Sequence, residues 1–425
     1  MTNNQQTQIN YTGPFITMVF LFFIVGFLTV VNQQFQSPLQ SALLSNVGGI
    51  QNTLAVMVTF AWFLSYPLTG GIGARLVNKH GYKNTMVRAL MVVAAGCAIF
   101  EASVLLQKYS DGAAIAFGES SIPYAYFLFL IGAYVVGAGV TIMQVVINPY
   151  LIACNVKGTS DVQRQNIGGA SNSIGTTLAP FFVGGIIFGG VAAADIKLDS
   201  LIVPFLAFIV VILAVAFLIT KLQLPNIANT TAEGGEKLER SIWSFRHLVL
   251  GVVAIFIYVG VEVCVGANLV MHANSDASWI ELAATMGSLY WGGMLVGRLI
   301  GSALSKVPAR TQLIVTSVAA GLLVIGGMLT DCLWLLVAVG LFHSVMWPST
   351  FALAIKGLGK YTSAGSGALM IGVLGGGVLP LLQGMIADAT GSWAATWIIV
   401  ILGEAYLLYY ALLGSRIRKQ DMIAE

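Results

Sequence analysis

Long apolar segments alternate with short segments that are polar or rich in glycine and proline along the whole chain. Each apolar segment has about 20 residues or more, which is the length of a helix that crosses a bilayer. The pattern predicts an all-α integral membrane protein with twelve transmembrane helices, over residues 14–38, 50–77, 84–107, 122–152, 164–192, 199–222, 244–273, 280–305, 311–330, 332–356, 363–387 and 394–416.

The twelve predicted helices divide into two sets of six. The stretch Asn226–Ser241 is polar and carries several charges and two glycines, as is typical of a flexible linker. We therefore expect an N-terminal half over 1–222, a cytoplasmic linker over 223–243 and a C-terminal half over 244–425.

The two halves also resemble each other. Pro149 and Pro348 are 199 positions apart, and the Gly-to-Pro segments that end at Pro180 and Pro380 are 200 apart. Two six-helix halves in parallel repeat resemble the major facilitator superfamily, whose substrate site lies between the halves near the middle of the membrane.

Composition and charge agree with a membrane protein. Hydrophobic residues make up 57% of the chain and charged residues 9%, too few charges to cover a soluble protein of 425 residues. This composition argues against a secreted, cytosolic or nucleic-acid-binding protein and predicts the lipid bilayer as its surroundings. The sequence has no nucleophile–base set, phosphate loop or metal-ligand cluster, so we expect no enzyme activity, no cofactor and no metal.

Basic residues predict the orientation. With twelve spans and both termini inside, all of the 20 Lys and Arg residues except Lys108 and Lys197 fall on the cytoplasmic side. Cytoplasmic loops are enriched in Lys and Arg. We expect a multi-pass monomer in the bacterial cytoplasmic (inner) membrane.

The segment between the second and third predicted spans carries a recognisable pattern. Its sequence, Gly73-Ala-Arg-Leu-Val-Asn78-Lys79-His-Gly81-Tyr-Lys83, resembles the corresponding superfamily loop, although Asn78 stands where an Asp is usual. A tight turn with cations near helix ends suits an inner gate. The expected gating residues are Gly73, Lys79, Gly81 and Lys83; plain positive-inside charge is the alternative interpretation.

Uncharged amide side chains are unusually frequent within the predicted spans. Amides donate to and accept from hydroxyl groups, and an aromatic ring stacks on the apolar face of a sugar. We therefore expect a small neutral sugar as the substrate. The alternative is that the amides hydrogen-bond helices to one another. The candidate sugar-binding residues are Asn32, Gln33, Gln144, Asn148, Gln165, Asn166, Asn172 and Trp347.

Glu262 is predicted to be the one carboxylate well inside a span. Burial disfavours its ionised form, so it can carry a proton during transport. The alternative is a structural pair, for which Arg298 is the candidate partner. His343 is expected to be a hydrogen-bonded filler, and four other acids are expected at span ends or on outer faces: Glu101, Glu281, Asp388 and Glu404.

Several of these segments together resemble the fucose–galactose–glucose:proton symporter family, over most of the chain. They are Gln144-Val-Val-Ile-Asn148-Pro149-Tyr150, Arg164-Gln165-Asn166 through Asn172-Ser173, Tyr258-Val-Gly260, the run from Pro348 to Gly359, and Gly375-Gly-Gly-Val-Leu-Pro380. The resemblance implies sugar import driven by a proton gradient.

Within that family the sequence resembles the glucose/galactose branch more than the fucose permeases. Fucose permeases carry Asp after the helix 1 Asn and Glu before the Asn-Pro block, where this chain has Gln33 and Gln144. Gln144 together with Glu262 matches the glucose/galactose branch. The alternatives are a sodium-coupled or uncoupled sugar carrier, a fucose or N-acetylhexosamine permease and, most remotely, a nutrient sensor.

Overall fold

The computed structural model describes residues 10–110, 113–117, 120–159, 161–190, 196–225, 239–303, 307–418 and 421. Most of the predicted linker, residues 226–238, lies outside the described residues. The described part is almost entirely helical: α1 (Thr12–Gln34), α2 (Gln36–Leu43), α3 (Gln51–Tyr109), α4 (Tyr124–Ala153), α5 (Asp161–Phe181), α6 (Ile202–Lys221), α7 (Arg246–Asn274), α8 (Ala283–Ala303), α9 (Ala309–Thr330), α10 (Leu333–His343), α11 (Met346–Ile355), α12 (Thr362–Ile371), α13 (Gly375–Thr390) and α14 (Ile398–Tyr409).

The helices account for all twelve predicted spans. Eight helices of the described residues are long and apolar enough to cross a membrane, or nine when α10 and α11, bent by 40°, are counted as one span. Helix α3 is long enough, at 59 residues, to contain two of the predicted spans. Helices α5 and α8 supply the remaining two. The predicted boundaries differ from the observed ones by a few residues because short 3-10 and π segments extend several helices.

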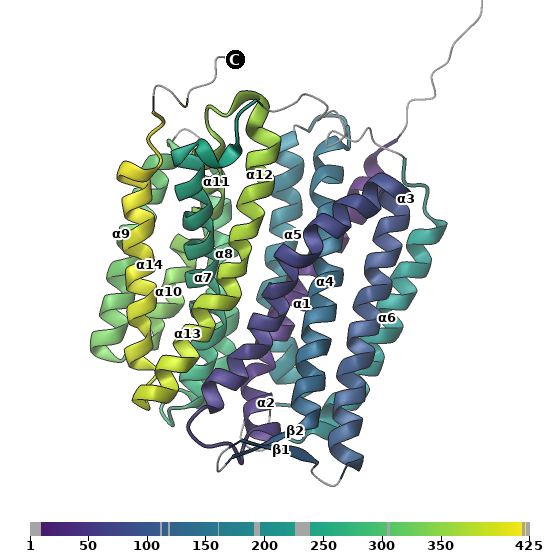
Figure 1. Cartoon of the computed structure of the whole chain (residues 1–425), viewed down its shortest axis with the longest axis vertical. Coiled ribbons are helices and arrows are strands. Elements are labelled where there is room, and N and C mark those ends of the chain that lie inside the picture. Colours follow the sequence, from purple (N-terminus) through teal and green to yellow (C-terminus); the bar gives the residue numbers. More distant parts are fainter. Residues whose placement is uncertain are drawn as a thin grey trace, which may run out of the picture.

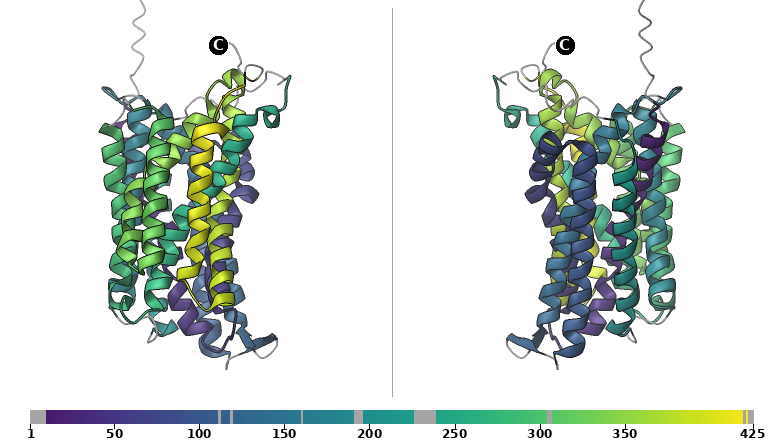
Figure 2. Two further views of the ribbon diagram at one scale, coloured as in Figure 1. Left: turned by 90° about the vertical axis from the view of Figure 1, so that its left-hand side faces the viewer. Right: turned by 90° about the vertical axis from the view of Figure 1, so that its right-hand side faces the viewer.

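The chain forms two helical halves, α1–α6 and α7–α14, that stand side by side (Figure 1). They meet along two helix pairs, α3 with α13 and α5 with α8. All the long helices run between the same two ends of the molecule (Figure 2). We call the end with β1 (Ala114–Phe117) and β2 (Ser120–Pro123) the hairpin end, and the opposite end, where α1 begins and α14 ends, the terminus end.

The small hairpin is one departure from the all-α expectation. Strands β1 and β2 pair antiparallel, with Ala114 opposite Pro123 and Phe117 opposite Ser120. Ser120 also reaches the turn between α2 and α3, where its hydroxyl oxygen accepts a hydrogen bond of 3.1 Å from the Gly48 N–H. The hairpin therefore braces a loop and adds no layer to the bundle.

Glycine lets the helices approach closely, as is usual inside membranes. A methyl group added at Gly26 of α1 would overlap the carbonyl oxygen of Asn172 in α5. One added at Gly375 of α13 would overlap the carbonyl oxygen of Phe256 in α7. Each half is therefore held together by backbone-to-backbone packing that any larger side chain would disrupt.

Direct hydrogen bonds tie the two halves at the hairpin end. The Asp388 carboxylate on α13 accepts from the backbone N–H groups of Asn52 (3.0 Å) and Thr53 (2.7 Å) and from the Thr53 hydroxyl (2.5 Å). These donors form the first turn of α3, where free N–H groups and the helix dipole favour an anion. Asn274 of α7 also donates to the Ser37 hydroxyl on α2 at 3.0 Å. Asp388, expected at a span end, thus has a specific bridging contact.

Candidate functional site

Three of the predicted amides come together in the N-terminal half. Gln165 of α5 donates its amide N–H to the Asn148 side-chain oxygen on α4 at 3.1 Å. One turn away on α4, Gln144 donates to the Tyr66 hydroxyl on α3 at 2.7 Å. Gln144, Asn148 and Gln165 are all partly exposed, and the Gln165 Oε1 atom is buried without a hydrogen-bond partner among the described residues. We call Gln144, Asn148, Gln165 and the Tyr66 that bonds Gln144 the amide cluster.

Local sequence explains how α4 presents two of these amides. Gln144 and Asn148 are four residues apart and share one face of the helix. Pro149 lies inside α4 and cannot donate a backbone hydrogen bond, which leaves the Val145 carbonyl without its helical partner. The resulting local irregularity coincides with the cluster.

Tyr66 was not predicted as a site residue. Its ring stacks on that of Phe63 with centroids 5.7 Å apart, and its hydroxyl is the acceptor for Gln144. The signal in the sequence was weak: an aromatic residue next to Pro67, inside a span whose other side chains are mostly apolar.

Two of the predicted sugar ligands lie elsewhere. Asn172 donates to the backbone oxygen of Phe22 in α1 at 3.0 Å and packs against Gly26. This hydrogen bond joins α5 to α1, which agrees with the alternative interpretation that the amides link helices to one another. Asn166 is exposed and belongs to no described contact of the amide cluster. Asn172 lies where α5 packs on α1, and its amide is taken up by that contact.

The amides of α1 are buried. Asn32 and Gln33 are each 2% exposed, and neither side chain has a hydrogen-bond partner among the residues that the structure describes. Consecutive residues of a helix point about 100° apart, so the two amides point in different directions from α1. An unpaired buried amide is costly, by about 1–3 kcal/mol. Asn32 and Gln33 can therefore accept and donate hydrogen bonds to a polar ligand that enters the bundle.

The predicted aromatic residue Trp347 lies in the C-terminal half, on the first turn of α11. The centroid of its ring lies 6.2 Å from that of Tyr258 on α7, and its ring stacks on that of Phe351 with centroids 6.3 Å apart. Trp347 is partly exposed, so one side of this aromatic group is open to contact. It follows directly after the 40° bend between α10 and α11.

Glu262 on α7 is linked to the same aromatic group. Its carboxylate accepts a hydrogen bond of 3.1 Å from the Tyr258 hydroxyl, and its backbone oxygen accepts one of 3.0 Å from Tyr290 on α8. Arg298, the predicted structural partner, lies within electrostatic reach but donates across the halves to the Ser173 hydroxyl and, at 3.4 Å, to the Gly169 oxygen.

The expectation that Glu262 is the one deeply placed carboxylate is wrong. Glu404 on α14 is 2% exposed and lies 2.8 Å from the Nε2 atom of His343, which is fully buried. Glu101 on α3 is also buried. Glu404 occupies the middle of the predicted span 394–416, and mid-span acids face protein rather than lipid. That position was the signal that could have identified it. His343 is hydrogen-bonded, as expected.

The predicted gating residues lie around a break in α3. Gly81 has φ +73°, a left-handed backbone conformation that glycine adopts without strain. At this residue α3 is interrupted, and the chain turns from its first segment into its second. Gly73 packs against Val145 and Ile142 of α4, whereas Lys79 is exposed and Lys83 partly exposed. The loop pattern is thus present as a single glycine break at the terminus end.

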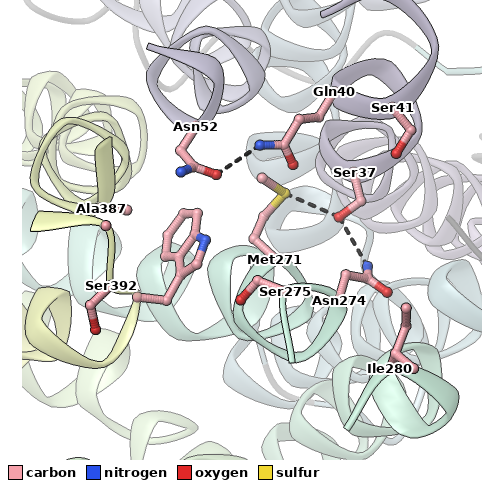
Figure 3. Close-up of a pocket in the computed structure, with 12 residues that line it drawn as sticks. Ser37, Gln40, Ser41, Asn52, Met271, Asn274, Ser275, Ile280, Ala387 and Ser392 are labelled. Atoms are coloured by element: carbon pink, nitrogen blue, oxygen red, sulfur yellow. Dashed lines mark hydrogen bonds between the residues drawn. The ribbon is translucent and has the colours of Figure 1, made fainter. Parts of the chain in front are cut away.

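A pocket of 290 Å³ opens between the halves at the hairpin end (Figure 3). It was not predicted. Ser37, Asn52 and Asn274 supply polar atoms to its wall, and the Gln40 amide donates to the Asn52 side-chain oxygen at 2.8 Å. The lining comes from α2, α3, the end of α7 with Ile280 after it, and the end of α13 with the segment that follows, directly beside the Asp388 contact.

Comparison with known proteins places this geometry in context. The chain is 34% identical over 420 residues to the glucose/galactose transporter of Brucella abortus, with 96% of both chains covered. It is 29% identical to the putative glucose/galactose transporter of Helicobacter pylori, covering 93% of this chain and 95% of that one. The L-fucose-proton symporter of Escherichia coli K12 is 24% identical, with 96% and 94% covered. No family model matches the chain.

Solved structures agree on the fold. A transporter of the major facilitator superfamily in the outward conformation matches with a TM-score of 0.68 and 22% identity, covering 96% of this chain and all of that one. The D-xylose-proton symporter matches with a TM-score of 0.73 and 14% identity, covering 98% and 100%.

Proposed function

The chain belongs to the fucose–galactose–glucose:proton symporter family of the major facilitator superfamily, a family of sugar transporters, and from this premise we propose that it imports a glucose- or galactose-like monosaccharide together with a proton. It is a multi-pass membrane protein and not an enzyme. The similarity to glucose/galactose transporters supports the choice of sugar. The residues at the amide cluster support it as well, since they are neutral donors and acceptors suited to hydroxyl groups.

The observation that carries the proposal is the amide cluster itself. Gln165 on α5 bonds Asn148 on α4, Gln144 on α4 bonds Tyr66 on α3, and the three amide residues each stay partly exposed. We infer that sugar hydroxyls bind this cluster from the N-terminal half while the Trp347 ring packs on the sugar from the C-terminal half.

Asn32 and Gln33 complete the proposed sugar site. Both amides are buried and lack partners within the described part of the chain. A sugar hydroxyl reaching either amide would supply the missing hydrogen bonds, and that gain favours binding. We assign no sugar contact to Asn166 or Asn172.

Transport follows from movement of one half against the other. The contacts of Asp388, Ser37 and Asn274 hold the halves together at the hairpin end. We assign the hairpin end to the outside and the terminus end to the cytoplasm, because basic residues concentrate at the latter. The gating residues at the Gly81 break then lie at the inner mouth, and the pocket of Figure 3 at the outer one.

Glu262 is the proposed coupling residue. Its link through Tyr258 to the Trp347 ring places a carboxylate next to the aromatic side of the sugar site. A carboxylate inside the membrane is costly to ionise, so it holds a proton until its surroundings change. Sugar and proton each shift the same equilibrium between the two conformations, and this linkage makes uphill transport possible.

Uptake of labelled sugars into vesicles containing the protein tests the proposal. We expect glucose or galactose to accumulate when an inward pH gradient is imposed and not when a sodium gradient replaces it. Accumulation with sodium alone, or equilibration without any gradient effect, would contradict proton symport and favour the sodium-coupled or uncoupled carrier. Preference for fucose or an N-acetylhexosamine would contradict the choice of sugar, and absence of transport would favour a sensor.

A further inference from the structure

A second ionisable group lies deep in the C-terminal half, apart from Glu262. His343 ends α10 and Glu404 lies within α14; their Nε2 and Oε1 atoms are 2.8 Å apart. The side chains are 0% and 2% exposed. The other carboxylate oxygen of Glu404, Oε2, is buried and has no hydrogen-bond partner among the described residues. A charged pair inside a membrane is costly, so its presence calls for a function.

The hydrogen bonds around His343 fix how many protons the pair holds. Tyr290 on α8 donates its hydroxyl proton to the backbone oxygen of Glu262 at 3.0 Å. Its oxygen therefore accepts from His343 Nδ1, which is 2.7 Å away. With Nδ1 protonated, the short contact between Nε2 and Oε1 requires one more proton between them. The pair carries that proton either as imidazolium with carboxylate or as imidazole with carboxylic acid.

We propose that the His343–Glu404 pair is a proton-binding site that takes part in coupling, in addition to Glu262. This inference rests on the proposed proton symport. In the step concerned, the proton between Nε2 and Oε1 leaves for water, so that a neutral imidazole and a Glu404 carboxylate remain; uptake is the reverse. The deprotonated pair would bring the Nε2 lone pair against a carboxylate oxygen, which is repulsive, so the two side chains must then separate.

The position of the pair explains how this step could reach the sugar. His343 is the last residue of α10, directly before the 40° bend into α11. Its backbone oxygen lies 3.0 Å from the Tyr258 hydroxyl, which is also 3.1 Å from Glu262. Tyr258 can donate to only one of these at a time. Separation of His343 from Glu404 therefore changes both the bend that carries Trp347 and the hydrogen bond to Glu262.

The charged and titratable groups around the pair are few in the part of the chain that the structure describes. Helix α7 contributes Tyr258 and Glu262, and α8 contributes Tyr290 and Arg298. Helix α9 places Gly321 beside Glu404. The charged residue of α9, Arg310, instead donates to the Ala411 backbone oxygen at 2.9 Å, near the C-terminus. Among these groups, Glu262 is the acid that a shared hydrogen-bond donor, Tyr258, connects to His343.

The test compares Glu404→Gln with wild type in reconstituted vesicles. Glutamine keeps the shape and can donate to His343 but cannot release a proton. We expect sugar-evoked proton movement, followed with a pH-sensitive dye, to fall by about tenfold or more, while exchange of labelled for unlabelled sugar stays within about twofold. The matched control is Glu101→Gln, which neutralises another buried carboxylate, in the N-terminal half, and should leave both measurements unchanged.

The outcomes separate this inference from the proposed function. If wild type itself moves no protons with sugar, proton symport is wrong and the inference falls with it. If wild type does and Glu404→Gln does equally, the pair is structural and Glu262 couples alone. If Glu404→Gln fails to exchange sugar, a second variant, Tyr290→Phe, tests whether the pair binds the coupled proton. It removes the acceptor for His343 Nδ1–H and weakens proton binding, so the pH midpoint of uphill uptake should move lower; an unchanged midpoint contradicts the inference.

Discussion

The candidate site residues of the two halves differ in kind. The N-terminal half presents neutral amides and a phenol at Gln144, Asn148, Gln165 and Tyr66. The C-terminal half instead links carboxylates and an imidazole through tyrosines. Amides recognise hydroxyl groups without changing charge, whereas carboxylates and imidazole exchange protons. Most of the proposed recognition residues therefore lie in the N-terminal half and the proposed coupling residues in the C-terminal half, and the movement of one half against the other joins the two functions.

The largest expected effect belongs to the coupling half. Glu262→Gln mimics the protonated acid with little change in shape, so sugar binding and exchange should remain. Accumulation driven by a pH gradient should be lost, because the residue can no longer release its proton. Uptake of labelled sugar with and without an imposed pH gradient measures both. A variant that still concentrates sugar would show that Glu262 only hydrogen-bonds Tyr258.

Substitutions in the recognition half should act on affinity instead. Asn148→Ala leaves Gln165 without its acceptor and removes a proposed sugar contact. We expect sugar binding to weaken by about 1–3 kcal/mol, or about 5- to 150-fold in Kd. The stoichiometry of protons per sugar should stay unchanged. Gln144→Ala should behave similarly; equilibrium binding, measured calorimetrically, tests both.

Asn172→Ala provides the contrast to these variants. Since its amide joins α5 to the Phe22 oxygen of α1, its loss should lower the thermal stability of the purified protein more than the affinity for sugar. A drop in affinity as large as that of Asn148→Ala, with unchanged melting temperature, would instead return Asn172 to the sugar site.

A substitution at the break in α3 lies outside both the proposed sugar-binding residues and the proposed coupling residues. Gly81→Leu places a branched side chain at φ 73° and ψ 170°, a backbone conformation that essentially only glycine adopts, at a cost of roughly 1–3 kcal/mol. We expect slower sugar exchange with nearly unchanged Kd, because the strain falls on the proposed inner gate and leaves both sites intact. An equal loss of affinity would mean that the break also shapes the sugar site.

The smallest effect is expected at His80, beside the same break. Partial desolvation, followed by the positive charges of Arg88 and Lys79, lowers the pKa of His80 below its usual value. The side chain is therefore neutral at pH 7 and above, and protonates only at lower pH than an ordinary histidine. His80→Gln should leave the pH profile of uphill uptake between about pH 7 and 8 unchanged. A shifted profile would locate part of the pH dependence outside the C-terminal half.

Much of the architecture was determined by the sequence alone. Lipid excludes unpaired backbone groups, so each long apolar run must be a helix, and all twelve predicted spans correspond to helices of the structure. The glycine pattern around Gly81 likewise indicated the break in α3, since only glycine adopts that backbone conformation without strain. The four-residue spacing of Gln144 and Asn148 placed both on one face for the same local reason.

Tertiary packing decided what the local pattern could not. Which face of a uniformly apolar helix meets protein and which meets lipid is not encoded in its hydropathy, so Glu404 was expected at a span end or on an outer face and Asn172 at the sugar site. Both assignments depended on the neighbouring helix: α10 brings His343 to Glu404, and α1 brings Phe22 to Asn172. The partners of a polar group inside a membrane come from distant parts of the chain, and for that reason only the folded structure reveals them.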